Sequence, residues 1–107
     1  MHKIVYLPVA RNDLIDIVSY ISEQLKAPQS AQNLLTEMST SIQKLAKFPY
    51  SCRVYHSPQP LDDEFRLLVV KNYLVFYVVT QDTVEIRRVI YAKRNLSSIL
   101  ERDKSPK

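Results

Sequence analysis

Arginine and tyrosine side chains recur between apolar positions along the last third of this 107-residue chain. Arg66 lies in one β-prone run, Tyr73 and Tyr77 lie in the next, and Arg88 lies in a third. Guanidinium groups hold phosphate through paired hydrogen bonds, and phenol rings stack on nucleotide bases. If these four side chains share one surface, that surface is suited to a phosphate-bearing or otherwise anionic partner.

The elements that carry these residues are predicted to be three successive β-strands over residues 65–70, 73–79 and 83–90, which are rich in β-branched and aromatic residues. The middle range is apolar at every position, which is typical of a strand buried on both faces at the centre of a sheet. Lys71-Asn72 and Gln81-Asp82 are the predicted turns. Because the chain has no glycine, we expect Asn or Asp to adopt the unusual backbone angles of these turns.

Two-residue turns fix how the predicted strands pair, with Arg66 opposite Tyr77 and Val75 opposite Arg88. Because side chains alternate between the faces of a sheet, this pairing places the two arginines on the same face as Tyr73 and Tyr77. The other face is richer in large aliphatic and aromatic groups, so we expect helices to cover it. The first face would then be open. The alternative is that the arginines extend into water at the strand ends and the tyrosines only pack against the surface of the sheet.

The N-terminal half is predicted to be helical after a short strand over residues 3–7. Apolar residues recur at spacings of three and four over residues 9–26 and again over about 30–47, which is typical of amphipathic helices. Ala27-Pro28 separates the two ranges, and Ser30 is the expected N-cap of the second helix. Two helices joined by so short a break should lie antiparallel, as a hairpin.

The predicted fold class is α+β: an N-terminal strand, an antiparallel helical hairpin, and an antiparallel β meander against which the hairpin packs. A chain of 107 residues is expected to form a single domain. Residues 49–64 should form a loop, with a short strand near 53–55. Asn95 is the expected cap of a last short helix, and residues 101–107 form a polar tail that should fray.

Charge and composition restrict the possible functions. The formal net charge of +4 suits an anionic partner, either nucleic acid or an acidic protein. The absence of glycine removes the glycine-rich loops that hold nucleotide phosphates, so no nucleotide cofactor is expected. The two histidines and one cysteine form no metal-ligand pattern. No segment has the character of a signal peptide or a membrane span, so we expect a cytoplasmic protein without a membrane partner.

Three segments carry a family resemblance: residues 9–21, the string from Phe65 through Lys71-Asn72-Tyr73 to Tyr77, and Arg88-Val-Ile-Tyr91-Ala-Lys93-Arg94-Asn95. With these the chain resembles the RelE/ParE superfamily, the toxins of bacterial type II toxin–antitoxin pairs and plasmid-stabilisation modules. The resemblance covers nearly the whole chain and implies the same fold. It also implies a neighbouring gene for an acidic antitoxin with a DNA-binding domain, so that operator DNA is bound only through the antitoxin.

The superfamily divides by target, and the resemblance favours one branch. RelE-like members cut mRNA on the ribosome, whereas ParE-like members inhibit DNA gyrase. The RNA-cutting members commonly have arginine at the position of Leu74, and Arg66 is the only basic residue of its predicted strand. We therefore expect a ParE-like, non-nucleolytic toxin that arrests growth. The alternatives are a RelE-like, ribosome-dependent mRNA endonuclease, and a degenerate toxin that only binds its antitoxin and regulates the operon.

Two sets of candidate site residues follow from the geometry and the resemblance. If the protein is a ribonuclease, Arg66, Arg88 and Tyr91 are the expected catalytic residues, because they supply positive charge and a proton donor. The residues expected to bind a target or a phosphate are Arg66, Tyr73, Tyr77, Arg88, Lys93 and Arg94. No cofactor or metal is expected in either case.

Overall fold

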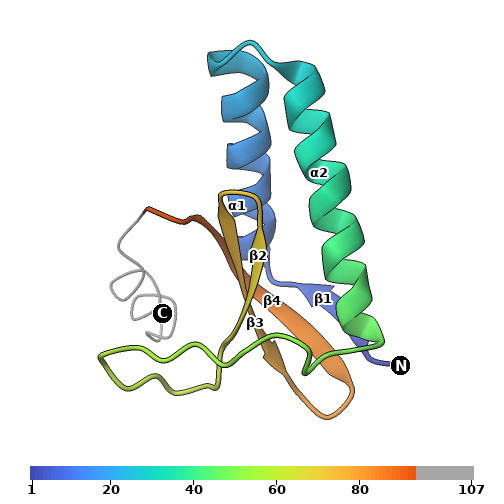
Figure 1. Ribbon diagram of the computed structural model, residues 1–107, viewed down its shortest axis with the longest axis vertical. Coiled ribbons are helices and arrows are strands. Elements are labelled where there is room, and N and C mark those ends of the chain that lie inside the picture. Colours follow the sequence, from blue (N-terminus) through green and yellow to red (C-terminus); the bar gives the residue numbers. More distant parts are fainter. Residues whose placement is uncertain (94–107) are drawn as a thin grey trace.

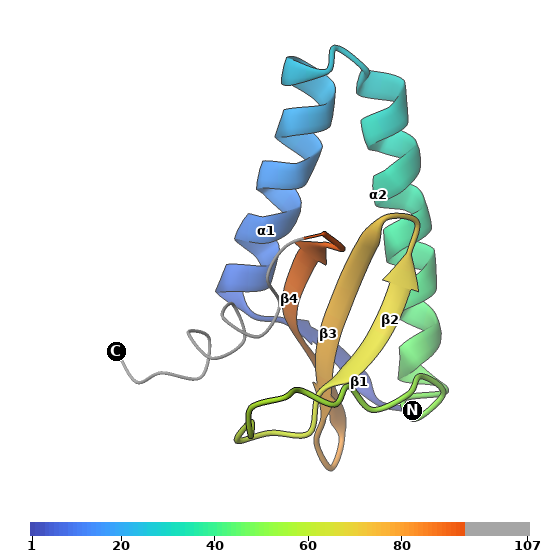
Figure 2. The ribbon, with the colours of Figure 1, turned by 60° about the vertical axis from the view of Figure 1, so that its left-hand side comes forward.

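A computed structural model describes residues 1–93 of the chain, and the expected helix after Asn95 lies outside the described residues. The hairpin of two long helices stands on one side of a four-stranded sheet and extends beyond its end (Figure 1, Figure 2). This arrangement confirms the predicted α+β fold. In chain order the elements are β1 (Lys3–Tyr6), α1 (Pro8–Ser19), a π-helical turn η1 (Tyr20–Gln24), α2 (Pro28–Gln43), a 3₁₀ turn η2 (Lys44–Ala46), β2 (Arg66–Val70), β3 (Tyr73–Val79) and β4 (Thr83–Tyr91).

Both long helices begin at a proline. Pro8 and Pro28 each stand at the start of a helix, where the missing N–H leaves no hydrogen bond unmade. Ser30, the expected N-cap, therefore lies inside the first turn of α2, and no side chain caps that helix. Between the helices Lys26 has a φ of 52°. Glycine usually takes this left-handed conformation where a helix ends, but the chain contains none, so an ordinary residue adopts it.

The sheet has the strand order β1-β4-β3-β2, so β3 is an interior strand, as its wholly apolar sequence predicted. β1 pairs in parallel with the first half of β4, from Thr83 to Ile86. The long connection that a parallel pair requires contains the helical hairpin, the following loop, β2 and β3. β4 continues beyond the end of β1, and α1 packs against it. The sheet is therefore mixed, with a parallel pair in addition to the predicted meander.

The β2–β3 turn lies where it was predicted, and Arg66 is opposite Tyr77. Lys71, with a φ of 53°, carries the positive backbone angle that was expected of Asn or Asp. The reason is positional, because a two-residue hairpin turn of this kind needs the positive angle at its first residue. Within the part of the chain that the structure describes, the Gln81-Asp82 turn contains no positive φ.

A β-bulge changes the predicted pairing of β3 with β4. Tyr77 is opposite Ile86 as predicted, but Phe76 is opposite Arg88, so Arg87 is an additional residue in β4. Val75 is consequently opposite Val89, and its predicted pairing with Arg88 is wrong. The shift matters for the candidate site because every side chain of β4 beyond the bulge moves by one position relative to β3.

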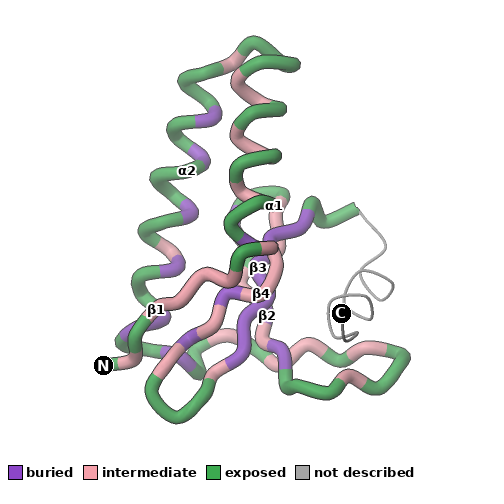
Figure 3. The backbone as a smooth tube through the Cα atoms, turned by 180° about the vertical axis from the view of Figure 1, so that it is seen from behind, coloured by how far each residue is buried: buried purple, intermediate pink, exposed green. Residues whose placement is uncertain are grey.

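The helices cover the face of the sheet that was expected to be open. Leu34 and Met38 of α2 pack with Val75 and Tyr77 in the main hydrophobic core, and buried positions recur along the inner side of α2 (Figure 3). The opposite face, which carries Phe76, is covered by the loop that precedes β2. The prediction failed because each face of the sheet carries a cluster of buried apolar residues, so the size of the apolar groups does not identify the helix-bearing face.

Candidate functional site

Arg66 and Tyr77 lie side by side at the base of the hairpin, where the chain between the helices and the sheet closes over them. The Tyr77 side chain is fully buried, and its hydroxyl donates a hydrogen bond of 2.9 Å to the carbonyl oxygen of Pro49. Burial raises the pKa of Tyr77 above its ordinary value of 10.0. An Arg66 Nη1–H donates a 2.7 Å hydrogen bond to the carbonyl oxygen of Cys52. These two side chains hold the loop against the sheet.

Arg88 binds a carboxylate of the first helix. Its Nε and Nη2 donate to the two carboxylate oxygens of Asp13 at 2.8 and 3.0 Å, and the Val89 backbone N–H donates to the same carboxylate at 2.9 Å. Both charged side chains are largely shielded, with 15% of Arg88 and 14% of Asp13 exposed. The arrangement joins α1 to the edge of β4 beyond the end of β1. The sequence gives no local sign of it, because the two residues are 75 positions apart.

Tyr73 and Tyr91 lie opposite each other at the other end of the sheet, with ring centroids 5.6 Å apart. Burial raises the pKa of Tyr73, and the neighbouring phenols of Tyr91 and Tyr20 raise it further. Lys93 is exposed just after β4, and Arg94 lies outside the described residues.

The three residues expected to be catalytic in a ribonuclease are therefore not gathered in one place. Arg66 is opposite Tyr77, whereas Tyr91 is opposite Tyr73, four residues away along β3. At the rise of a β-strand this separation is about 13 Å. A group that attacks, a group that protonates and a group that stabilises charge must all be within hydrogen-bond reach of one phosphate.

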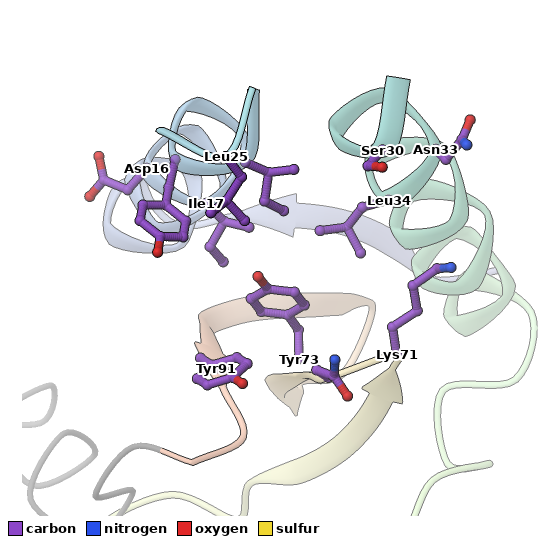
Figure 4. Close-up of a pocket in the computed structure, with 12 residues that line it drawn as sticks. Asp16, Ile17, Leu25, Ser30, Asn33, Leu34, Lys71, Tyr73 and Tyr91 are labelled. Carbon is purple, nitrogen blue, oxygen red and sulfur yellow. The ribbon is translucent and has the colours of Figure 1, made fainter. Parts of the chain in front are cut away.

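A cleft of about 920 Å³ lies between the far half of the hairpin and the end of the sheet (Figure 4). The helical hairpin extends beyond the end of the sheet (Figure 2). Apolar side chains near its tip, such as Leu25, therefore face this cleft and not the sheet. Tyr73 and Tyr91 lie across the cleft from them. Its other lining residues are Asp16, Ile17, Tyr20, Ile21, Ser30, Asn33, Leu34, Lys71 and Asn72.

The cleft was only partly foreseen in the sequence. Tyr73 was a predicted site residue and does line the cleft, but the helix residues were assigned to the core because of their helical spacing. Periodicity indicates which residues share a helix face. It does not indicate how far the helix extends beyond the sheet, so Leu25 in the cleft could not be distinguished from core residues such as Met38.

Residues 1–93 contain neither a metal-binding cluster nor a membrane-spanning helix. In this range no group of three or more His, Cys, Asp or Glu side chains is placed so that it could hold a metal ion. Over the same residues no helix combines the length and the apolar character needed to cross a membrane.

Comparison with known proteins identifies the family. A model of the ParE toxin of the type II toxin–antitoxin system parDE matches residues 4–96. Among solved structures, a chain of the chromosomal ParDE TA system from P. aeruginosa has a TM-score of 0.71 and 17% identity, over 87% of this chain and 98% of that chain. No curated protein matches. At this identity the solved structure shows a shared fold, and the match of the family model from β1 through β4 shows that the chain belongs to the ParE family, the toxins of type II toxin–antitoxin systems.

Proposed function

We propose that this protein arrests growth by binding a protein target, DNA gyrase, and that it does not cut RNA. The observation that supports this proposal is the placement of the polar groups. Arg88 is held by Asp13 at the outer edge of β4, and Arg66 is held by the Cys52 carbonyl at the far end of the sheet from Tyr91. Each cation is already engaged in joining parts of the fold.

The chemistry of RNA cleavage adds to this argument. Removing a proton from a 2′-hydroxyl requires a base that is unprotonated near neutral pH. Tyr73, the other phenol beside Tyr91, has its pKa raised by burial, so it remains protonated. A toxin that acts by occupying a surface of its target needs no such group.

The proposal is tested with purified toxin in two parallel assays. We expect excess toxin to block supercoiling of relaxed plasmid by gyrase and to leave mRNA intact in a translating extract. Codon-positioned cuts in the translated message with normal supercoiling would overturn the proposal in favour of the RelE-like alternative. Normal supercoiling, intact message and unimpaired growth on expression would instead indicate a degenerate toxin that only binds its antitoxin.

We further propose that the cleft between the hairpin and the sheet binds an acidic, amphipathic segment of the antitoxin, with operator DNA bound by the antitoxin. An α-helix is about 10 Å wide and buries its apolar face in grooves of this kind. The cleft offers apolar side chains such as Ile17 and Leu25. The exposed Lys71 at its margin lies 3.5 Å from Glu37 and can exchange this surface ion pair for an acidic group of the partner. The net charge of +4 favours the same partner.

A matched pair of variants tests this binding site. Leu25 in the cleft and Ile15 outside it, both near α1, are 56% and 58% exposed, so neither substitution should disturb the core. Leu25→Asp should weaken binding of the antitoxin encoded by the adjacent gene about tenfold, because burying the exposed part of this leucine contributes about 1–2 kcal/mol. Ile15→Asp should leave the affinity within about twofold. Equal effects of the two variants in calorimetric titration would contradict the assignment of the cleft.

A further inference from the structure

Two aromatic side chains are exposed at the base of the hairpin, at the opposite end from the cleft. Phe48 is 58% and Tyr50 is 59% exposed, although Pro49 between them is buried. They follow η2 in the segment that leaves the end of α2 close to the N-terminus (Figure 2). Neighbouring large apolar groups left in water often mark a surface that contacts a partner.

This segment, residues 48–52, is fixed in place by the fold and is called the aromatic turn below. The Pro49 carbonyl accepts the buried Tyr77 hydroxyl at 2.9 Å, and the Cys52 carbonyl accepts Arg66 Nη1–H at 2.7 Å. Within the turn, the Ser51 hydroxyl donates to the Phe48 carbonyl at 2.8 Å. The two rings are thus presented by a backbone that is already ordered, and binding need not pay the entropy of ordering it.

Positive charge accompanies both rings of the aromatic turn. Lys47 Nζ lies 5.8 Å from the centroid of the Phe48 ring, and Arg66 Cζ lies 5.0 Å from the centroid of the Tyr50 ring. Two further cations, Lys44 and Arg53, are exposed in the same stretch of chain.

Negative charge is sparse around the aromatic turn. Between Glu37 and Asp62 the sequence contains no acidic residue at all. Glu64 lies 3.7 Å from the Arg66 guanidinium. Asp82 is another acidic residue, and it lies beside β1, where its backbone carbonyl accepts a hydrogen bond from the Lys3 N–H. The stretch that contains the aromatic turn is therefore more basic than the chain as a whole.

We propose that the aromatic turn, together with Lys44, Lys47 and Arg53, binds single-stranded nucleic acid. Exposed rings offer faces on which unpaired bases stack, and the cations beside them neutralise the backbone phosphates. Duplex DNA would use the cations alone, since its bases are already stacked. Every base has a ring face on which to stack, so the binding should tolerate most sequences.

This activity is separate from the proposed action on gyrase and from the antitoxin cleft. It is measured by fluorescence anisotropy of a labelled thymidine oligonucleotide of about 12 nucleotides, titrated with the full chain at low salt. We expect a dissociation constant of the order of 10 µM. Phosphate contacts by three cations predict a log–log salt slope of about −2, so the affinity should fall about sixteenfold between 50 and 200 mM salt.

Two exposed aromatic positions provide the matched variants. Phe48→Ala and Tyr50→Ala should each weaken oligonucleotide binding about tenfold, because stacking on an aromatic side chain contributes that much per base. Tyr20→Ala removes a ring of similar exposure, 55%, near the far end of the hairpin and should leave the affinity unchanged. Lys47→Gln should reduce the salt slope by about 0.7, whereas Lys26→Gln should not.

Three results would overturn the inference. The first is the absence of binding by the unmodified chain at low salt. The second is a loss of affinity in Tyr20→Ala as large as that in Phe48→Ala, which would place the contact elsewhere. The third is that a polyglutamate peptide competes for the site and its own binding is weakened by Tyr50→Ala. That result would identify an acidic protein as the partner in place of nucleic acid.

Discussion

Replacing Asp13 by asparagine is expected to lower the free energy of unfolding by about 2–4 kcal/mol. The Asp13 carboxylate accepts two hydrogen bonds from Arg88 and one from the Val89 N–H, all between 2.8 and 3.0 Å. An asparagine of the same shape has one acceptor oxygen, and its NH₂ group would face donors. Breaking a buried ion pair costs about 3–5 kcal/mol. We lower that figure because 14–15% of each side chain is in contact with water.

The measurement is equilibrium urea unfolding of the full chain, with Asp16→Asn as the control. Asp16 lies in the same helix one turn after Asp13 but is exposed, so the same substitution there should cost less than about 0.5 kcal/mol. Combining Asp13→Asn with Arg88→Met should destabilise the protein by less than the sum of the single variants, since both break one interaction. The reasoning is refuted if Asp13→Asn and Asp16→Asn have the same unfolding midpoint.

The remaining predictions concern Tyr77 and Lys26. Tyr77→Phe removes the hydrogen bond to Pro49 and should cost about 1 kcal/mol in urea unfolding. Burial raises the pKa of Tyr77 above 10.0, so the folded chain keeps the phenol protonated at a pH where the unfolded chain ionises. The contribution of Tyr77 to the free energy of unfolding is therefore complete below about pH 10 and is lost as the pH rises further. Stability above about pH 10 should fall less steeply in Tyr77→Phe. Lys26→Gly should stabilise the fold by about 0.5–1 kcal/mol in thermal unfolding, because the residue has a φ of 52°, and an unchanged midpoint would count against this reasoning.

The parts of the fold that follow from local patterns were predictable from the sequence. The wholly apolar run from Tyr73 to Val79 predicted an interior strand, and the Lys71-Asn72 turn gave the pairing of Arg66 with Tyr77. Both features depend on residues within about a dozen positions of one another. The helical hairpin was predictable for the same reason, because its spacing and its break at Pro28 are local.

The candidate site was harder to predict because its geometry depends on contacts that are remote in sequence. A single inserted residue, Arg87, moved Arg88 out of its predicted register, and no feature of the sequence announces a bulge. The face of the sheet that carries the helices could not be chosen from the size of its side chains. The loop ahead of β2 packs against the second face through Tyr55 and Leu61, and both faces consequently need large apolar groups.

The structural roles of the predicted site residues suggest a different way of locating functional surfaces in this chain. Arg66, Arg88 and Tyr77 were chosen because their chemistry could act on a ligand, yet each forms a hydrogen bond that joins the sheet to another part of the fold. Apolar side chains in water have no comparable role in stabilising the protein. Leu25 beside the cleft and Phe48 in the aromatic turn remain exposed at a cost to solvation, so the surfaces around them are the ones we expect partners to cover.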